Sequence, residues 1–222
     1  MNPFDKIKKQ INKDLHHKLP KKWKKIGNIL VADFSQINTN NLSQVSQIYA
    51  NILKVKTVLQ KNKVNGELRK PKRTEILFGE DTETEITEYG LKYSMDLSKT
   101  MWSPGNTGWR AVLDGPEKVS SFYNFGSPKV IIDYFAGIGY FTIQLAKSYP
   151  NAKIISIDKN PDSIKYLKKN LKINNIDNIK KEFDLDKYII LFPFCSSHLQ
   201  IKKWPNYNKL IDLIKNKFKD EY

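Results

Sequence analysis

Apolar and polar positions alternate with two different periods in the first hundred residues. Two segments repeat apolar residues at helical spacing, and several short apolar runs have the length of strands. Helices are expected at 4–19 and 42–53, and strands at 26–34, 55–60, 74–78 and, as a hairpin broken by Tyr89-Gly90, at 86–97. This mixture predicts a small α+β domain over residues 1–100.

From residue 101 onward the pattern changes to a regular alternation of strands and helices. Strands are expected at 130–133, 152–158 and 188–192, and helices at 109–123, 141–148, 161–174 and 210–218. Such alternation favours the α/β class, with a Rossmann-type domain and a parallel, doubly wound sheet over residues 101–222. Ligands of these folds bind at the carboxyl ends of the strands.

A glycine turn follows the strand at 130–133. The strand ends in Asp133, and Gly137 and Gly139 precede the next helix. Glycines let the backbone approach a ligand closely, and a helix N-terminus offers unpaired N–H groups. About twenty residues later Asp158 ends the second strand, where an acid can accept both hydroxyls of a ribose. The segment therefore predicts a site for a nucleoside-containing cofactor.

The dinucleotide-binding fingerprint fits this turn poorly. It requires a third glycine where the chain has Thr142. Asp133 would also repel a pyrophosphate. A ligand with a cationic centre and an ammonium group suits such an acid better, and S-adenosylmethionine is such a ligand.

The chain is strongly basic, with 38 lysines and arginines against 23 acids in 222 residues and a formal net charge of +15. A proteome rich in Lys and Asn would give the same excess, whereas a functional cause would be a polyanionic partner. Clustering favours a partner. One cluster around Trp23 holds Lys18, Lys21, Lys22, Lys24 and Lys25, and another holds Lys61, Lys63, Arg69, Lys70, Lys72 and Arg73. Basic segments with an aromatic residue suit RNA, because rings stack on bases.

Several function classes find no support in the sequence. No apolar stretch reaches the length of a membrane span, so no membrane partner is expected. The start of the chain lacks the apolar core of a signal peptide, and the one cysteine, Cys195, excludes a disulfide framework. A cytoplasmic location is expected. The three histidines show no metal-ligand spacing, so no metal site is predicted.

Short motifs between residues 19 and 204 resemble a family that joins two tRNA position-37 enzymes, the guanine N-1 methyltransferase and the wybutosine-synthesising aminocarboxypropyltransferase. The motifs are Leu19-Pro20-Lys21-Lys22-Trp23, Gly66-Glu67-Leu68-Arg69, Glu88-Tyr89-Gly90-Leu91, Met101-Trp102-Ser103-Pro104-Gly105-Asn106 and Asp133-Tyr134-Phe135-Ala136-Gly137-Ile138-Gly139. Each motif is modest alone, but their order and spacing are specific.

Two features resemble the aminocarboxypropyl branch, namely the loop F-A-G-I-G-Y-F and Ser196-Ser197 before Trp204. The resemblance implies transfer of a 3-amino-3-carboxypropyl group from S-adenosylmethionine, as co-substrate, to 4-demethylwyosine at position 37 of phenylalanine tRNA. It implies a monomer whose residues 1–100 bind tRNA and whose residues 101–222 bind the cofactor. Two alternatives stay open: a tRNA guanine-37 N-1 methyltransferase, and a non-catalytic RNA-binding protein with a decayed cofactor site.

The resemblance also implies a set of cofactor contacts. Ser103 and Arg110 match a cofactor-contacting hydroxyl and basic residue, and a cation can clamp the methionine carboxylate. The expected contacts are Ser103, Arg110, Asp133, Phe135, Ala136, Gly137, Gly139 and Asp158. No catalytic base is assigned.

The chain departs from the family pattern at three points. Trp109 stands where the family usually has Glu, and the adenine-side pair is missing, with Asp184 as a partial substitute. Relatives continue with further strands after the last expected helix. The resemblance therefore predicts a catalytic domain shortened at its C-terminus.

Overall fold

The computed structural model describes residues 1–66, 68, 70–71, 74–102, 107–112, 128 and 130–176. All of them belong to one compact unit, Met1–Phe183. The predicted division near residue 100 stays a prediction. Outside the described residues lie the strand predicted at 188–192, the helix predicted at 210–218, Ser103, Asp184 and the Ser196-Ser197 element.

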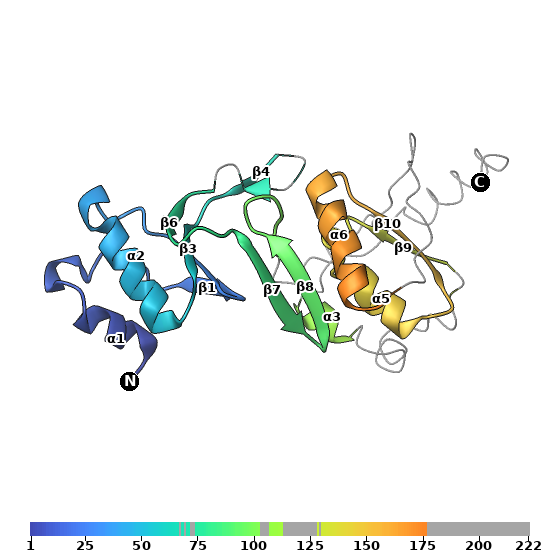
Figure 1. Ribbon diagram of the computed structural model, residues 1–222, viewed down its shortest axis with the longest axis horizontal. Coiled ribbons are helices and arrows are strands. Elements are labelled where there is room, and N and C mark those ends of the chain that lie inside the picture. Colours follow the sequence, from blue (N-terminus) through green and yellow to red (C-terminus); the bar gives the residue numbers. More distant parts are fainter. Residues whose placement is uncertain are drawn as a thin grey trace, which may run out of the picture. The chain divides into compact units, whose positions relative to one another are not determined.

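A four-stranded sheet with the order β1-β2-β3-β6 forms the centre of the N-terminal part (Figure 1). Its strands are β1 Trp23–Ile26, β2 Ile29–Ala32, β3 Thr57–Gln60 and β6 Ile76–Phe78. β2 and β3 run parallel, and the other neighbours run antiparallel. α1 Pro3–Lys9 and α2 Thr39–Leu53 cover one face, where Phe34 and Tyr49 pack edge to face.

Two predicted elements of this part are wrong in extent. The strand predicted at 26–34 is only β2, Ile29–Ala32, and Ile26 ends β1, a strand that the sequence did not predict. Gly27 turns the chain between them at φ 55°, and a Cβ there would lie 2.2 Å from Thr84 Oγ1. The helix predicted at 4–19 ends at Lys9, and a short 3-10 helix, η1 Lys13–Leu15, follows. The Asn12 side chain begins this second turn, since it accepts a hydrogen bond from the Asp14 N–H at 3.2 Å.

The hairpin predicted at 86–97 is confirmed as β7 Glu83–Glu88 and β8 Leu91–Asp96. Its residues Tyr93 and Met95 form a second core with Ile29 of the sheet and Ile138 of the glycine turn. Neighbouring strand residues point to opposite faces, so Ile29 belongs to this second core and Leu30 to the first.

The C-terminal part of the described chain confirms the predicted alternation. β9 Val130–Tyr134 and β10 Lys153–Ile157 pair in parallel, and α5 Thr142–Ser148 and α6 Pro161–Ile173 follow them. α6 begins as the sequence predicts, with Pro161 in its first turn, and Asn160 caps it by accepting from the Asp162 N–H at 3.0 Å. The remaining elements are α3 Thr107–Val112 and two short strands, β4 Val64–Asn65 and β5 Lys70–Pro71.

Two asparagines, Asn170 of α6 and Asn174 at its C-cap, bind the edge of β8 that does not face β7. The buried Asn170 amide accepts from the Ser94 N–H at 2.7 Å and donates to the Ser94 carbonyl at 3.0 Å. One turn later, Asn174 pairs with the N–H and carbonyl of Lys92 at 2.9 and 2.7 Å. These amides satisfy the strand edge as another strand would, and they fix α6 against the hairpin.

Candidate cofactor site

The glycine turn lies between β9 and α5, and the structure confirms its tight backbone. Gly137 and Gly139 have φ values of 57° and 97°, in the region that favours glycine. A Cβ on Gly139 would lie 2.5 Å from Leu167 Cδ1 and 2.9 Å from Ile143 Cδ1. Any larger residue at 139 would therefore require the Leu167 and Ile143 side chains to shift, and it would be strained at this φ.

Phe135 also has a left-handed backbone, with φ 63°, although it is not glycine. This conformation costs roughly 1–2 kcal/mol for an L-residue. Two backbone hydrogen bonds of Ala136 hold Phe135 in this conformation. The Ala136 N–H donates to Ile157 O at 3.0 Å, and the Ala136 carbonyl accepts from the Gly139 N–H at 2.9 Å. The Phe135 side chain is 60% exposed. Strained backbone of this kind is concentrated at functional sites.

Asp158 connects the end of β10 to the glycine turn. One carboxylate oxygen accepts the Gly137 N–H and the other accepts the Asn160 N–H, both at 2.8 Å. A carboxylate has about four lone-pair positions. The two backbone bonds therefore leave acceptor capacity for ribose hydroxyls, the role that the sequence predicts for Asp158.

Asp133 lies beneath the turn rather than at its exposed side. Its side chain is buried and accepts a hydrogen bond from Thr142 Oγ1 at 2.6 Å. Burial raises the pKa of the Asp133 carboxyl to about 6, and the nearby charge of Asp158 adds to this effect. Thr142 thus stands where a dinucleotide fingerprint has its third glycine, and its hydroxyl donates a hydrogen bond to Asp133.

Arg110, on α3, has no exposed surface and is paired with Glu88 of β7. Its Nε lies 2.5 Å from one Glu88 oxygen, and its Nη2 lies 3.2 Å from the other. The guanidinium carbon also lies 5.0 Å from the Trp102 ring and 5.5 Å from the Tyr140 ring. Tyr140 directly follows Gly139, so Arg110 packs beside the glycine turn, and its contact with the cofactor stays a prediction.

Glu88 is the site residue that sequence reasoning missed. It belongs to a motif of the resemblance, but nothing local connects it to Arg110, which is 22 residues away. The available signal was Trp109, which stands where the family usually has Glu. A buried arginine that lacks this adjacent acid needs an acidic partner from another part of the chain. Ser103 lies outside the described residues, so its contact with the cofactor stays a prediction.

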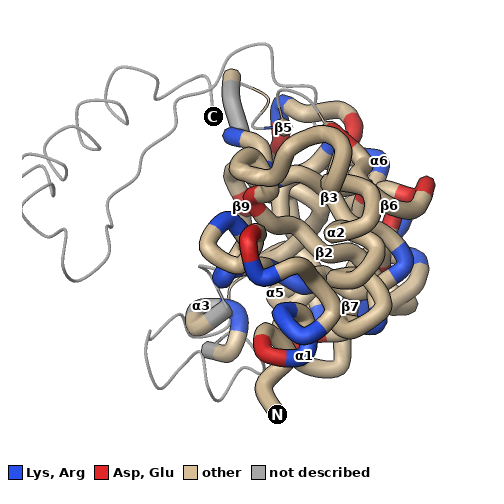
Figure 2. Tube along the Cα trace, turned by 90° about the vertical axis from the view of Figure 1, so that its left-hand side faces the viewer, with Lys and Arg blue, Asp and Glu red and all other residues tan. Residues whose placement is uncertain are grey.

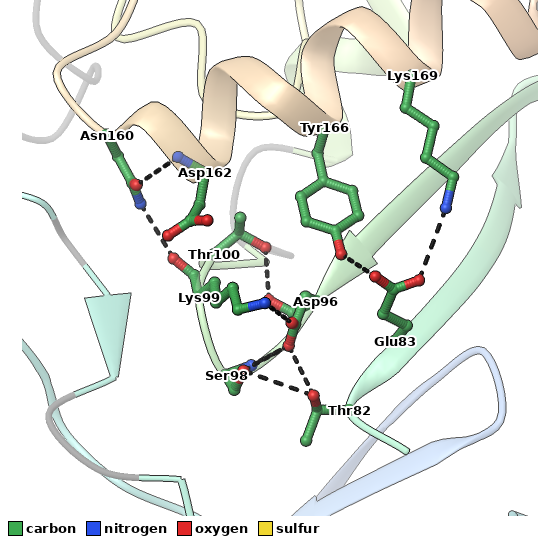
Figure 3. A network of polar contacts seen from close by, with 10 residues as sticks. All are labelled: Thr82, Glu83, Asp96, Ser98, Lys99, Thr100, Asn160, Asp162, Tyr166 and Lys169. Atoms are coloured by element: carbon green, nitrogen blue, oxygen red, sulfur yellow. Dashed lines mark hydrogen bonds and ion pairs between the residues drawn. The ribbon is translucent and has the colours of Figure 1, made fainter.

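A polar network joins the segment before Ser103 to the start of α6 (Figure 3). Asp96 accepts from Thr82 Oγ1 at 2.7 Å and from Ser98 Oγ at 2.6 Å. Burial alone would raise the pKa of Asp96, but the hydrogen bonds from Ser98 and Thr82 outweigh it and lower that pKa. Asn160 donates to Lys99 O at 3.0 Å, so the helix cap beside Asp158 also holds this segment.

The residues of the lysine cluster around Trp23 differ in what they contact, since some hold the N-terminal part together and others are exposed to solvent. Trp23 packs against Tyr49 at 6.0 Å, and Lys25 donates to Leu53 O at 2.8 Å, at the C-terminal end of α2. Lys22 and Lys24 are exposed. Figure 2 shows that basic residues are spread over several elements, α1, α5 and α6 among them.

Metal-binding and membrane-spanning features are also absent from the part of the chain that the structure describes. No three His, Cys, Asp or Glu side chains gather there as a metal site would require. No helix there is long and apolar enough to cross a bilayer.

A parallel strand pair, a glycine turn that opens a helix and an acid at the end of each strand define a Rossmann-type nucleotide-binding fold. The chain belongs to the TRM5/TYW2 methyltransferase domain family, whose model matches residues 84–200. A second model, the TYW2 N-terminal domain, matches residues 4–82. The family predicted from the motifs is thereby confirmed.

Curated relatives agree with this assignment. A Pyrococcus horikoshii protein named tRNA(Phe) (4-demethylwyosine(37)-C(7)) aminocarboxypropyltransferase is 33% identical over 81% of this chain and 61% of its own length. Its Methanocaldococcus jannaschii namesake is 33% identical over 71% of this chain and 58% of its own length. The chain thus spans less than two thirds of each relative.

Solved structures confirm the fold class. Pyrococcus horikoshii TYW2 in complex with MeSAdo matches 83% of this chain and 66% of its own, with a TM-score of 0.61 and 29% identity. The complex of aTrm5 and tRNALeu matches 81% of this chain and 52% of its own, with a TM-score of 0.64 and 27% identity.

Proposed function

We propose that this chain transfers the 3-amino-3-carboxypropyl group of S-adenosylmethionine to 4-demethylwyosine at position 37 of phenylalanine tRNA. The match of residues 4–82 to the N-terminal domain of TYW2 carries the proposal, because that model is named for TYW2 alone, whereas the model of residues 84–200 is named for both branches. Two relatives at 33% identity, both named for this reaction, support it further.

The proposed reaction is a displacement at the sulfonium of the cofactor. C7 of the modified base attacks the methylene carbon of the amino-acid arm that is bonded to sulfur. A carbon–carbon bond forms, the carbon–sulfur bond breaks, and sulfur keeps the electron pair as methylthioadenosine. The base then loses the C7 proton to solvent. The protein contributes mainly by holding the reacting atoms about 3–3.5 Å apart and in line.

The described residues have distinct parts in this proposal. The turn around Gly137 lets the cofactor approach the backbone, and Asp158 accepts the ribose hydroxyls. Arg110 orients the methionine carboxylate, which decides whether the methylene or the methyl carbon faces the base. Glu88 already neutralises this guanidinium, so the cofactor carboxylate competes with Glu88 for it.

A label-transfer experiment tests the proposal. Phenylalanine tRNA carrying 4-demethylwyosine is incubated with the protein and S-adenosylmethionine labelled either in the methyl group or in the amino-acid arm. Label should enter the RNA from the amino-acid arm only. Asp158→Ala, which loses the ribose contact, is the matched control and should transfer less label at the same cofactor concentration.

The second candidate is a tRNA guanine-37 N-1 methyltransferase. Pyrococcus abyssi tRNA (guanine(37)-N(1))-methyltransferase Trm5b is 29% identical over 76% of this chain, and the aTrm5 structure fits as well as that of TYW2. Label entering RNA only from the methyl group would establish this candidate. No transfer from either label, with the cofactor bound, would contradict both transferases and favour a non-catalytic RNA-binding protein.

A further inference from the structure

A cavity of about 360 Å³ opens on the face of the four-stranded sheet that α1 and α2 do not cover. Its apolar lining includes Ile26 of β1, Val31 of β2, Leu59 of β3 and Leu97 after β8. Cavities of ~300–1,000 Å³ are typical of small-molecule sites. The cavity is therefore large enough for one nucleoside-sized ligand.

Trp102 forms an aromatic wall of this cavity and is half-buried. Its ring lies 5.1 Å from the Tyr140 ring, and Tyr140 follows the second glycine of the cofactor turn. Of the described residues that line the cavity, none belongs to the turn itself. The cavity is thus a separate site that shares one aromatic contact with the cofactor turn.

Exposed lysines stand at the mouth of the cavity. Lys22, Lys24 and Lys61 line it, and no described lining residue is acidic. The alternation of β1 explains the placement, because Lys24 shares a face with the buried Ile26 whereas Lys25 points to α2. A mouth with this charge attracts a polyanion, and an apolar interior with an aromatic wall suits an unstacked base.

We propose that this cavity holds a nucleobase of the RNA substrate that neighbours the modified nucleotide. The base stacks on Trp102, its edge meets Asn62 and Thr74, and the adjoining phosphates bind Lys22, Lys24 and Lys61. This inference rests on the proposed function in one respect, that the substrate is an RNA. It adds a second base-binding site, which would fix the position of the RNA strand relative to the cofactor.

The test combines cavity-filling substitutions with RNAs that lack one base. Thr74→Trp places an indole at the cavity, and Thr87→Trp, at an exposed position of β7, is the matched control. Anticodon stem-loops with a single abasic site at each loop position are titrated against the full chain without cofactor. Thr74→Trp should weaken binding of the intact RNA by about 5- to 150-fold, whereas Thr87→Trp should not.

The outcome depends on whether the effects of the protein substitution and of the abasic site on binding are additive. Non-additive effects show that the two changes remove the same contact. An abasic site next to the modified nucleotide should weaken binding to the wild type by a similar factor and have no further effect on Thr74→Trp. Additive losses at every loop position would overturn the inference. Coupling at the modified nucleotide itself would also overturn it, because the cavity would then hold the target base.

Two further measurements keep the test independent of folding and of catalysis. Thermal melting checks that each variant is folded. Lys24→Glu, at an exposed residue of the cavity mouth, tests the same site without filling the cavity, and Lys9→Glu on α1 is its control. Lys24→Glu should reduce the salt dependence and the abasic effect together, and Lys9→Glu should leave the abasic effect unchanged. Coupling without label transfer would refute only the proposed function, whereas label transfer without coupling would refute only this inference.

Discussion

The buried ion pair between Arg110 and Glu88 gives the sharpest test of the site. Glu88→Gln keeps the size of the side chain and removes its charge, so a fully buried guanidinium loses this charged partner. Removing one partner of a buried pair costs about 3–5 kcal/mol. Because the Glu88 side chain is 17% exposed, we expect the free energy of unfolding to fall by the lower value, ~3 kcal/mol.

Urea unfolding followed by circular dichroism measures this loss. The matched control is Asp5→Asn in the pair of Asp5 and Lys8, which are 46% and 36% exposed and should cost about 0–1 kcal/mol. The double change Arg110→Met and Glu88→Met should recover much of the loss, since an apolar pair of similar volume often replaces a buried ion pair. A loss no larger than that of Asp5→Asn would refute the reasoning.

The same variant tests whether Arg110 binds the cofactor carboxylate. If Glu88 competes with that carboxylate, Glu88→Gln should increase the preference of the protein for S-adenosylmethionine over its decarboxylated analogue. Calorimetry with both ligands measures the ratio of affinities in wild type and variant. An unchanged ratio would show that Glu88 does not compete with the cofactor carboxylate for Arg110.

Three other substitutions test the turn and its support. Asp158→Ala should weaken S-adenosylmethionine binding by about 1.5–3 kcal/mol in calorimetry, and equal affinities would remove Asp158 from the site. Asn170→Leu leaves Ser94 and Ile138 backbone groups unpaired and should cost about 3 kcal/mol of stability in urea, whereas Asn51→Leu, at an exposed position of α2, should cost much less. Because the pKa of Asp133 is raised from 3.8 to about 6, the folded state holds its proton more tightly than the unfolded chain. Stability should therefore fall by about 2.4 kcal/mol as pH rises from 4 to 7, and Asp133→Asn should flatten this part of the urea-measured profile.

Local periodicity was sufficient to predict most elements of the described chain. The hairpin of β7 and β8, the parallel pair of β9 and β10, and α6 with its proline start all followed from spacing and turn residues. The two errors arose where a local polar or glycine signal interrupts an apolar pattern. Gly27 turns the chain near the start of one expected strand, which is thereby limited to Ile29–Ala32, and Asn12 begins a new turn inside one expected helix.

Contacts between distant segments were beyond sequence reasoning. Asn170 bonds to Ser94, which is 76 residues away, and Arg110 bonds to Glu88 across 22 residues. Such partners depend on how elements pack, which no single-sequence pattern specifies. One weak signal existed for Asn170, because it is a polar residue on the same helix face as Leu167 and Tyr166, which are buried. A buried amide on that face requires hydrogen-bond partners.

The same contacts indicate from which side a cofactor approaches the glycine turn. Leu167 and Ile143 fill the inner side of Gly139, and Asn170 donates to Ile138 O at 2.9 Å, so α6 holds the turn from behind. The turn therefore cannot relax toward the core, although Phe135 keeps a strained backbone. Its open side is the one with the 60% exposed Phe135 side chain. A ligand that contacts the backbone of the turn must reach it from the Phe135 side, where a planar adenine or ribose face can also cover the exposed ring.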